Sequence, residues 1–301
     1  MTIVPAISKE MIALYDRFTH GEGMTGRREM LAGLARLTGS VALAAAVLPS
    51  IEARAEAAPL TSADDPRLQA EMLAYAGANG HRMTGYLARP KHGAERLPTT
   101  LVIHENRGLN EHIRDVTRRL ALSGMVVLAP DFLAPLGETP RRGDGVNSAD
   151  DIARLLVGSL DPGATVADAV ASLDWLKGFE QGRGTPSAVG YCWGGGVVNR
   201  LAMAAGAKLR AGVVYYGPAP ADTAGVGRIR ARMLLHYAGL DERVNAGAPA
   251  WLDALKVAGV TSESYIYPNV NHAFNNDTAP ARYDKAAAHL AWDRTLAWLK
   301  A

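Results

Sequence analysis

Short apolar segments that alternate with helical segments constrain the fold of this chain more than any other feature of its sequence. Apolar runs at 97–104, 187–191, 211–216 and 232–237 are separated by stretches in which apolar residues recur three and four positions apart. Because such runs are apolar on both faces, they predict a mostly parallel sheet that is covered by helices on each side. We therefore expect an α/β fold.

A β-hairpin is expected ahead of the first of these runs. Segments 71–77 and 82–88 flank Gly77-Ala78-Asn79-Gly80, and an Asn-Gly pair is a strong hairpin signal. No linker rich in Pro, Gly or Ser divides residues 66–301. The sequence thus predicts one domain over residues 67–301 that opens with a hairpin.

Charge and cysteine content exclude several classes of protein. The chain has 32 Lys and Arg against 30 Asp and Glu, a net charge of +2, and 48% of its 301 residues are hydrophobic. This balance excludes a disordered chain and gives no reason to expect a nucleic-acid partner. Cys192 is the only cysteine, so neither an intrachain disulfide nor a cysteine-based zinc cluster is expected.

Residues 1–55 have the order of features found in a twin-arginine export signal. Arg27 and Arg28 precede an uncharged stretch, 37–51, and Ala53-Arg54-Ala55 then places small residues where a signal peptidase reads. That stretch is too short for a membrane span, so no stable span is expected after processing. The sequence predicts a periplasmic or secreted protein that meets the twin-arginine machinery, with 56–66 as a tether. The alternatives are an amphipathic helix packed on the domain, and a cytoplasmic protein.

The segment around the single cysteine carries the strongest chemical signal. An apolar strand ends in Gly190-Tyr191-Cys192-Trp193-Gly194, and a helical stretch follows. In this strand–turn–helix arrangement the central residue is a nucleophile on a sharp turn above the edge of the sheet. The start of the helix stabilises a thiolate, and the backbone N–H of Trp193 can bind a developing oxyanion. We predict that Cys192 is the nucleophile.

A cysteine nucleophile needs a base, and the base needs an acidic residue that orients it. In this kind of sheet the acid and then the histidine follow the nucleophile along the chain. Asp241 comes just after the apolar strand 232–237, and His272 comes after the strand 262–267. We therefore predict that His272 is the general base and acid, and that Asp241 orients it.

The turn that follows the apolar run 97–104 completes the predicted site. The N–H of Asn106 is the candidate second oxyanion donor. Glu105, beside the nucleophile, can hold or exchange the thiol proton. Arg107 is expected either to bind an anionic substrate or to pair with Glu105.

Neither a metal nor a cofactor is expected. His104, Glu105 and His112 lack the histidine spacing of a helical zinc site. The glycines that follow Cys192 do not form the Gly-x-Gly-x-x-Gly pattern of a dinucleotide-binding loop.

Together these residues resemble the dienelactone hydrolase family over about residues 70–300. The resemblance is carried by the motif GYCWGG at 190–195, the Asp241 turn, the motif HAF at 272–274, and Glu105. It implies an α/β-hydrolase fold, and a Cys-His-Asp triad that opens an unsaturated lactone or ester while a glutamate holds the resting thiol. Tyr191 and Phe274, which lie within the two motifs, are expected to bind substrate.

Two positions depart from this family pattern. The resemblance implies an arginine four residues after the histidine that binds a substrate carboxylate, and this chain has Asn276 there. A second substrate arginine would follow the strand 125–129, and the segment 131–135 contains none. The triad is therefore better supported than dienelactone as the substrate.

The sequence leaves two classes of function open. The favoured one is a cysteine-dependent hydrolase of a small ester or lactone, with a broader thioesterase or peptidase-like acyl hydrolase as a variant of the same chemistry. The alternative is a non-catalytic binding protein of the same fold. The oligomeric state is left open.

Overall fold

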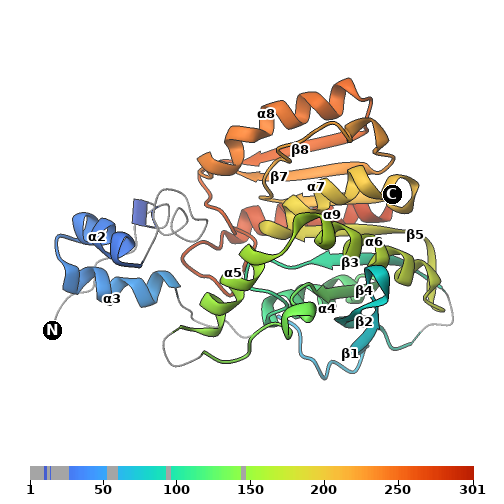
Figure 1. The fold of residues 1–301 in the computed structure, drawn as a ribbon, viewed down its shortest axis with the longest axis horizontal. Helices are drawn as coiled ribbons and strands as arrows, with labels where there is room; N and C mark the ends of the chain where they lie inside the picture. The colour runs from blue at the N-terminus through green and yellow to red at the C-terminus, as the bar shows by residue number, and fades with distance from the viewer. Residues whose placement is uncertain (1–9, 12–13, 15–26, 53–59, 93–95, 144–146) are drawn as a thin grey trace.

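The computed structural model describes residues 10–11, 14, 27–52, 60–92, 96–143 and 147–301. Its strands form one eight-stranded sheet (Figure 1). They are β1 (Leu68–Ala76), β2 (Arg82–Pro90), β3 (Leu97–Ile103), β4 (Val126–Asp131), β5 (Gly182–Tyr191), β6 (Ala211–Tyr215), β7 (Arg232–Ala238) and β8 (Ser262–Tyr267). The helices are α2 (Arg27–Thr38), α3 (Val41–Glu52), α4 (Glu111–Leu122), α5 (Ala149–Ser159), α6 (Pro162–Gly178), α7 (Trp193–Ala205), α8 (Glu242–Val257) and α9 (Lys285–Lys300).

The order of the strands confirms the predicted architecture. Along the sheet they run β1-β2-β4-β3-β5-β6-β7-β8. The hairpin β1–β2 is antiparallel and turns at Asn79 and Gly80, both of which have positive φ. β2 also runs antiparallel to β4, and every later pair is parallel. The carboxyl ends of β3, β5, β6, β7 and β8 therefore lie at one edge of the sheet, where the predicted site residues follow them.

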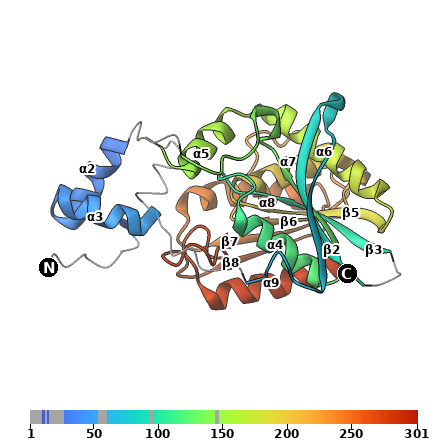
Figure 2. The same ribbon diagram turned by 90° about the horizontal axis from the view of Figure 1, so that it is seen from below.

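Two hydrophobic cores, one on each face, hold the sheet between its helices. Buried residues of α6, α7 and α8 belong to one core, and those of α4 and α9 belong to the other. Figure 2 shows α4 and α9 on one side of the sheet and α6 and α7 on the other. The side chain of Trp193 packs against both cores and against a third, small cluster. This cluster is formed by Leu133 together with Ala153 and Val157 of α5.

The spacing of apolar residues predicts helices over 248–258 and 279–299, and the structure begins both at other residues. α8 begins at Glu242 because the Asp241 carboxylate accepts a hydrogen bond from the backbone N–H of Val244, which caps the helix. α9 begins at Lys285 and not near residue 279, because Asp284 caps it by accepting from the N–H of Ala287. The later start of α9 leaves residues 268–284 as a long loop at the edge of the sheet where the predicted site residues lie.

The two N-terminal helices have a small core of their own. Met30 and Leu34 of α2 pack with Ala44 and Val47 of α3, and none of the side chains described in these two helices belongs to the two main cores. Among the described residues no single helix is long and apolar enough to cross a membrane, although α2 and α3 pass that test as a pair bent by 105°. The predicted cleavage site, Ala53-Arg54-Ala55, lies outside the described residues.

Candidate active site

Cys192 lies at the turn between the central strand β5 and helix α7. Its backbone has φ 53° and ψ −118°, a conformation that costs energy for a residue with a side chain. The turn is tight on both sides: a Cβ on Gly190 would lie 2.2 Å from the carbonyl oxygen of Gly194. A Cβ on Gly194 would lie 2.4 Å from the carbonyl oxygens of Ile103 and His104. Only glycine fits at these two positions, and the cysteine turn therefore sits against the end of β3.

The predicted base and its orienting acid are in direct contact. His272 Nδ1 lies 2.5 Å from Asp241 Oδ2, and both side chains are buried. Burial opposes ionisation of Asp241, but the charge and hydrogen bond of His272 outweigh it and hold the pKa of this carboxyl below its ordinary value. An ionised Asp241 accepts a hydrogen bond from the Nδ1–H group and leaves Nε2 as the nitrogen that can act as a base.

The imidazole of His272 also interacts with the thiol of Cys192. Burial would lower the pKa of His272, but the negative charge of a Cys192 thiolate, together with the charge and hydrogen bond of Asp241, raises it well above its ordinary value. The Cys192 side chain is 5% exposed and His272 is 4% exposed. The three residues form a buried, charge-coupled row in the order acid, imidazole, thiol.

Glu105 lies in the same buried region and is held by two neutral donors. Its Oε1 accepts a hydrogen bond of 3.4 Å from the Tyr216 hydroxyl, and its Oε2 accepts one of 3.2 Å from Asn276 Nδ2. The ring of Tyr216 also contacts that of His272, with centroids 4.8 Å apart. Glu105 is therefore tied to the loop that carries the base.

The two candidate oxyanion donors lie at adjoining turns. Asn106 is in the turn after β3, where the Glu105 carbonyl oxygen accepts from the N–H of Gly108. Trp193 begins α7, and its ring stacks on His104 with centroids 5.2 Å apart. The close approach of Gly194 to the end of β3 brings these two turns together.

The three residues expected to contact substrate each have defined neighbours within the protein. Arg107 forms an ion pair of 3.2 Å with Asp150 of α5. Tyr191 and Phe274 are fully buried at 0% exposure, and both belong to the core on the α4 and α9 face. Both rings pack against other tyrosines, and their expected contact with substrate stays a prediction.

The sequence model of the dienelactone hydrolase family matches this chain over residues 83–301. The chain belongs to the dienelactone hydrolase family. A candidate carboxymethylenebutenolidase of Escherichia coli O157:H7 is 34% identical over 241 residues, which is 74% of this chain and 84% of that protein. One of Methylorubrum extorquens is 32% identical over 232 residues, or 71% of this chain and 75% of that protein.

Solved structures support the same assignment of this dienelactone hydrolase family member. A candidate dienelactone hydrolase of Klebsiella pneumoniae superposes with a TM-score of 0.67 at 26% identity, covering 77% of this chain and 99% of the other. Brefeldin A esterase, a bacterial homologue of human hormone sensitive lipase, gives 0.62 at 13% identity and covers 97% of this chain and 93% of the other. The second likeness shows the fold alone. The chain is thus a hydrolase with the α/β-hydrolase fold, as the sequence predicted.

Two residues of the family member's site were not singled out from the sequence as site residues. Tyr216 directly follows β6 at the catalytic edge, and its φ of 38° marks a constrained position. Asn276 appeared only as a departure from the family pattern, yet it contacts Glu105. The position of Tyr216 directly after a parallel strand could have indicated that it belongs to the site. Nothing in the sequence indicated that Asn276 contacts Glu105.

A pocket of about 360 Å³ opens at the same edge of the sheet but lies beside β2 and the start of α6. Phe132, Leu136 and Leu160 contribute to its lining, and none of Cys192, Asp241 and His272 does. Among the described residues, no group of three or more His, Cys, Asp or Glu side chains is arranged to hold a metal ion.

Proposed function

We propose that this chain hydrolyses a carboxylic ester or lactone through an acyl-enzyme on Cys192. The observation that carries the proposal is the buried row in which Asp241 holds His272 at 2.5 Å while His272 is coupled to the thiol at the strained turn. Membership of the dienelactone hydrolase family supports the hydrolysis of an ester or lactone bond.

The geometry supports a two-step mechanism. His272 takes the thiol proton, and the thiolate of Cys192 attacks the ester carbonyl carbon. The N–H groups of Trp193 and Asn106 stabilise the oxyanion, and protonated His272 then donates its proton to the leaving alkoxide. In the second step a water molecule gives its proton to His272 and attacks the thioester, which releases the acid and restores the thiol. Asp241 stays ionised throughout and keeps the imidazole oriented.

Glu105 has a place in the resting state under this proposal. A carboxylate near the thiol disfavours a second negative charge, so it favours a neutral thiol until substrate arrives. Tyr216 and Asn276 both donate to Glu105, and these bonds hold its carboxylate in position. A neutral thiol resists alkylation and oxidation better than a thiolate.

Hydrolysis of 4-nitrophenyl acetate by the purified chain tests the proposal. We expect turnover that is lost in Cys192→Ala and after treatment with iodoacetamide, and a burst of one 4-nitrophenolate per active site if deacylation is slow. Full activity of Cys192→Ala would exclude the mechanism. Absence of turnover on esters, lactones and thioesters alike would favour a non-catalytic binding protein, and cleavage of anilides would indicate a broader acyl hydrolase.

We also propose that residues 1–55 direct twin-arginine export to the periplasm. The proposal is supported by Arg27-Arg28 ahead of the apolar stretch, and by α2 and α3 having a core separate from those of the domain. We expect Arg27→Lys with Arg28→Lys to leave the protein in the cytoplasm, while Arg36→Lys, the matched control, is exported. Mass spectrometry of periplasmic material is expected to give a chain that begins near Glu56; an intact Met1 there would contradict cleavage.

A further inference from the structure

The loop between β8 and α9 holds Asn276 in one defined orientation. Asn276 Oδ1 accepts two hydrogen bonds from Thr278, at 3.0 Å from its backbone N–H and 2.7 Å from its hydroxyl. Because the oxygen is used in this way, the Nδ2 group faces Glu105 and donates to it. The position of this loop therefore sets the distance between the amide of Asn276 and the carboxylate of Glu105.

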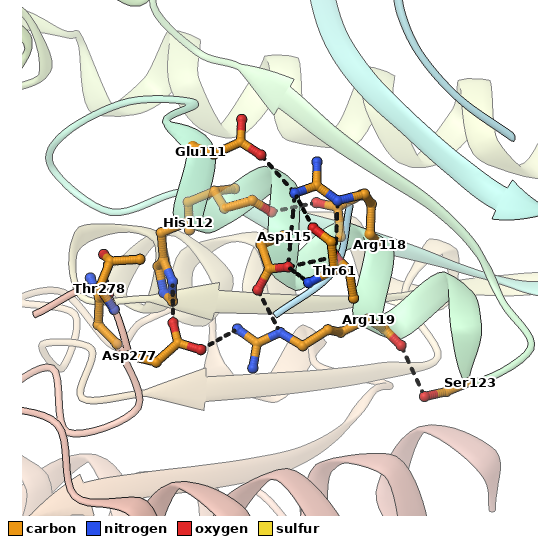
Figure 3. Close-up of polar contacts among 12 residues, drawn as sticks. Thr61, Glu111, His112, Asp115, Arg118, Arg119, Ser123, Asp277 and Thr278 are labelled. Carbon is orange, nitrogen blue, oxygen red and sulfur yellow. Dashed lines mark hydrogen bonds and ion pairs between the residues drawn. The ribbon is translucent and has the colours of Figure 1, made fainter. Parts of the chain in front are cut away.

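Asp277, the next residue, contacts helix α4. Its Oδ1 lies 3.3 Å from His112 Nδ1, and its Oδ2 lies 3.6 Å from Arg119 Nη2 (Figure 3). Burial opposes ionisation of Asp277, but the hydrogen bond of His112 and the charge of Arg119 outweigh it and hold the pKa of Asp277 below its ordinary value. The loop is thus fixed to α4 by a charged contact.

The part of α4 that receives Asp277 is itself firmly held. Arg119 Nε lies 3.0 Å from Asp115 Oδ2, and Asp115 Oδ1 accepts from both the backbone N–H and the hydroxyl of Thr61, at 2.7 Å and 2.5 Å. Arg118 donates to the Thr61 hydroxyl and carbonyl and to Glu111 (Figure 3). Asp115 and Arg118 are each 1% exposed, and a buried network with its charges paired is rigid.

We propose that Asp277 is a positioning residue for hydrolysis: its contact with His112 and Arg119 holds the loop of His272 and Asn276 in register with Glu105 and Cys192. Asp277 does not touch the reacting atoms and acts through its neighbour Asn276. This inference rests on the proposed cysteine-dependent hydrolysis, since Glu105 and His272 act there.

Asp277→Asn tests this role, because the amide keeps the shape of the side chain and removes its charge. We expect kcat on 4-nitrophenyl acetate to fall about tenfold while KM stays within about twofold, since a small displacement of a catalytic group affects the chemical step. We also expect iodoacetamide to alkylate Cys192 faster than in the parent, because Glu105 is less well held beside the thiol. If Asp277 only stabilised the fold, the folded variant would keep the parental kcat and the parental alkylation rate of Cys192.

Asp168→Asn is the matched control. Asp168 is also a buried aspartate paired with a histidine, at 3.2 Å from His81 Nε2, but it lies on α6 away from the loop. We expect this variant to lose stability and to keep the kcat and alkylation rate of the parent. All rates are measured well below the lowest melting temperature of the set. An equal loss of kcat in Asp168→Asn would overturn the inference, because general destabilisation would then explain both.

His112→Phe reaches the same contact from α4 and serves if Asp277→Asn does not fold. It removes the partner of Asp277 Oδ1 and leaves Arg119 in place, so a smaller fall in kcat in the same direction is expected. Parental kcat and alkylation rate in both variants would overturn the inference. Cys192→Ala separates this result from failure of the proposed function: if that variant is inactive and Asp277→Asn is unimpaired, only the positioning role fails.

Discussion

Backbone strain gathers at the residues that surround the thiol. Six residues other than glycine have positive φ in the described part of the chain. Three of them are Cys192, the proposed nucleophile, Tyr216, which donates to Glu105, and Ala273, which follows the proposed base His272. Such conformations persist only where the surrounding structure holds them. Here the backbone packs closely around Gly190 and Gly194, on either side of the turn, and this packing holds Cys192 in its strained conformation.

Replacement of Glu105 by Gln tests how the resting thiol is controlled. Gln keeps the size of the side chain and removes the negative charge that disfavours a thiolate. We expect Glu105→Gln to be alkylated by iodoacetamide at least threefold faster than the parent at neutral pH, and to turn over ester more slowly. The charge-conserving control Glu138→Asp, which alters a carboxylate on the loop after β4, is expected to match the parent in both assays. Equal alkylation rates in Glu105→Gln and the parent would show that Glu105 does not control the thiol.

At the scale of the elements, helix α4 connects the N-terminal segment to the catalytic edge. Thr61 falls within the segment expected to be a tether, yet its side chain is buried at 8% exposure and contacts both Asp115 and Arg118 of α4. On its other side α4 receives Asp277. The chain just after the proposed export signal therefore packs as part of the domain from Thr61 onward.

Removal of the Thr61 hydroxyl is expected to destabilise the protein. Thr61→Val leaves the buried Asp115 carboxylate and the Arg118 guanidinium each with one hydrogen bond fewer, at a cost of about 1–3 kcal/mol in unfolding free energy. Chemical denaturation measures this loss. Ser62→Ala, which removes the adjacent, exposed hydroxyl, is expected to change stability by less than about 0.5 kcal/mol. A loss in Thr61→Val no larger than in Ser62→Ala would contradict a stabilising role for the contact.

Sequence reasoning found those elements and residues whose signal is local. The hairpin at Asn79-Gly80, the cysteine turn, and the placement of Asp241 and His272 after strands all follow from short segments, and the structure brings Asp241 and His272 together. The Glu105–Asn276 contact joins residues 171 positions apart, so only tertiary packing creates it. The sequence did not indicate the burial of Tyr191 and Phe274 for a related reason: a motif locates a residue along the chain but does not show which side of the strand end is covered.

At the scale of the whole molecule, buried neutral histidines couple the stability of the fold to pH. His236 lies in β7 at 0% exposure, where its ring nitrogens meet the Tyr267 and Thr295 hydroxyls. Burial, with the charge of Arg294, lowers the pKa of His236 to about 3. Burial likewise lowers the pKa of His104. Since an unfolded histidine titrates near pH 6.5, the unfolded chain binds protons between about pH 6.5 and 3 that the folded protein excludes.

The free energy of unfolding is therefore expected to fall as the pH drops below about 6.5. One excluded proton contributes a slope of up to about 1.4 kcal/mol per pH unit. His236→Gln removes that contribution, so its stability is expected to decline less steeply than that of the parent from pH 6.5 to 4.5, whatever its absolute value. His289→Gln, at an exposed position in α9, is the control and is expected to keep the parental slope. Parallel curves for His236→Gln and the parent would contradict this assignment.

The position of Trp193 is expected to make its intrinsic fluorescence sensitive to chemistry at Cys192. Its indole packs against both cores and the α5 cluster and stacks on His104, and Trp193 directly follows Cys192, the proposed nucleophile. Indole emission responds to the polarity and charge of its surroundings, so formation and decay of an acyl group on Cys192 are expected to change it. The difference between the parent and Trp193→Phe isolates this signal from the other tryptophans. Stopped-flow fluorescence would then follow acylation by unlabelled esters and allow a substrate search without chromogenic leaving groups.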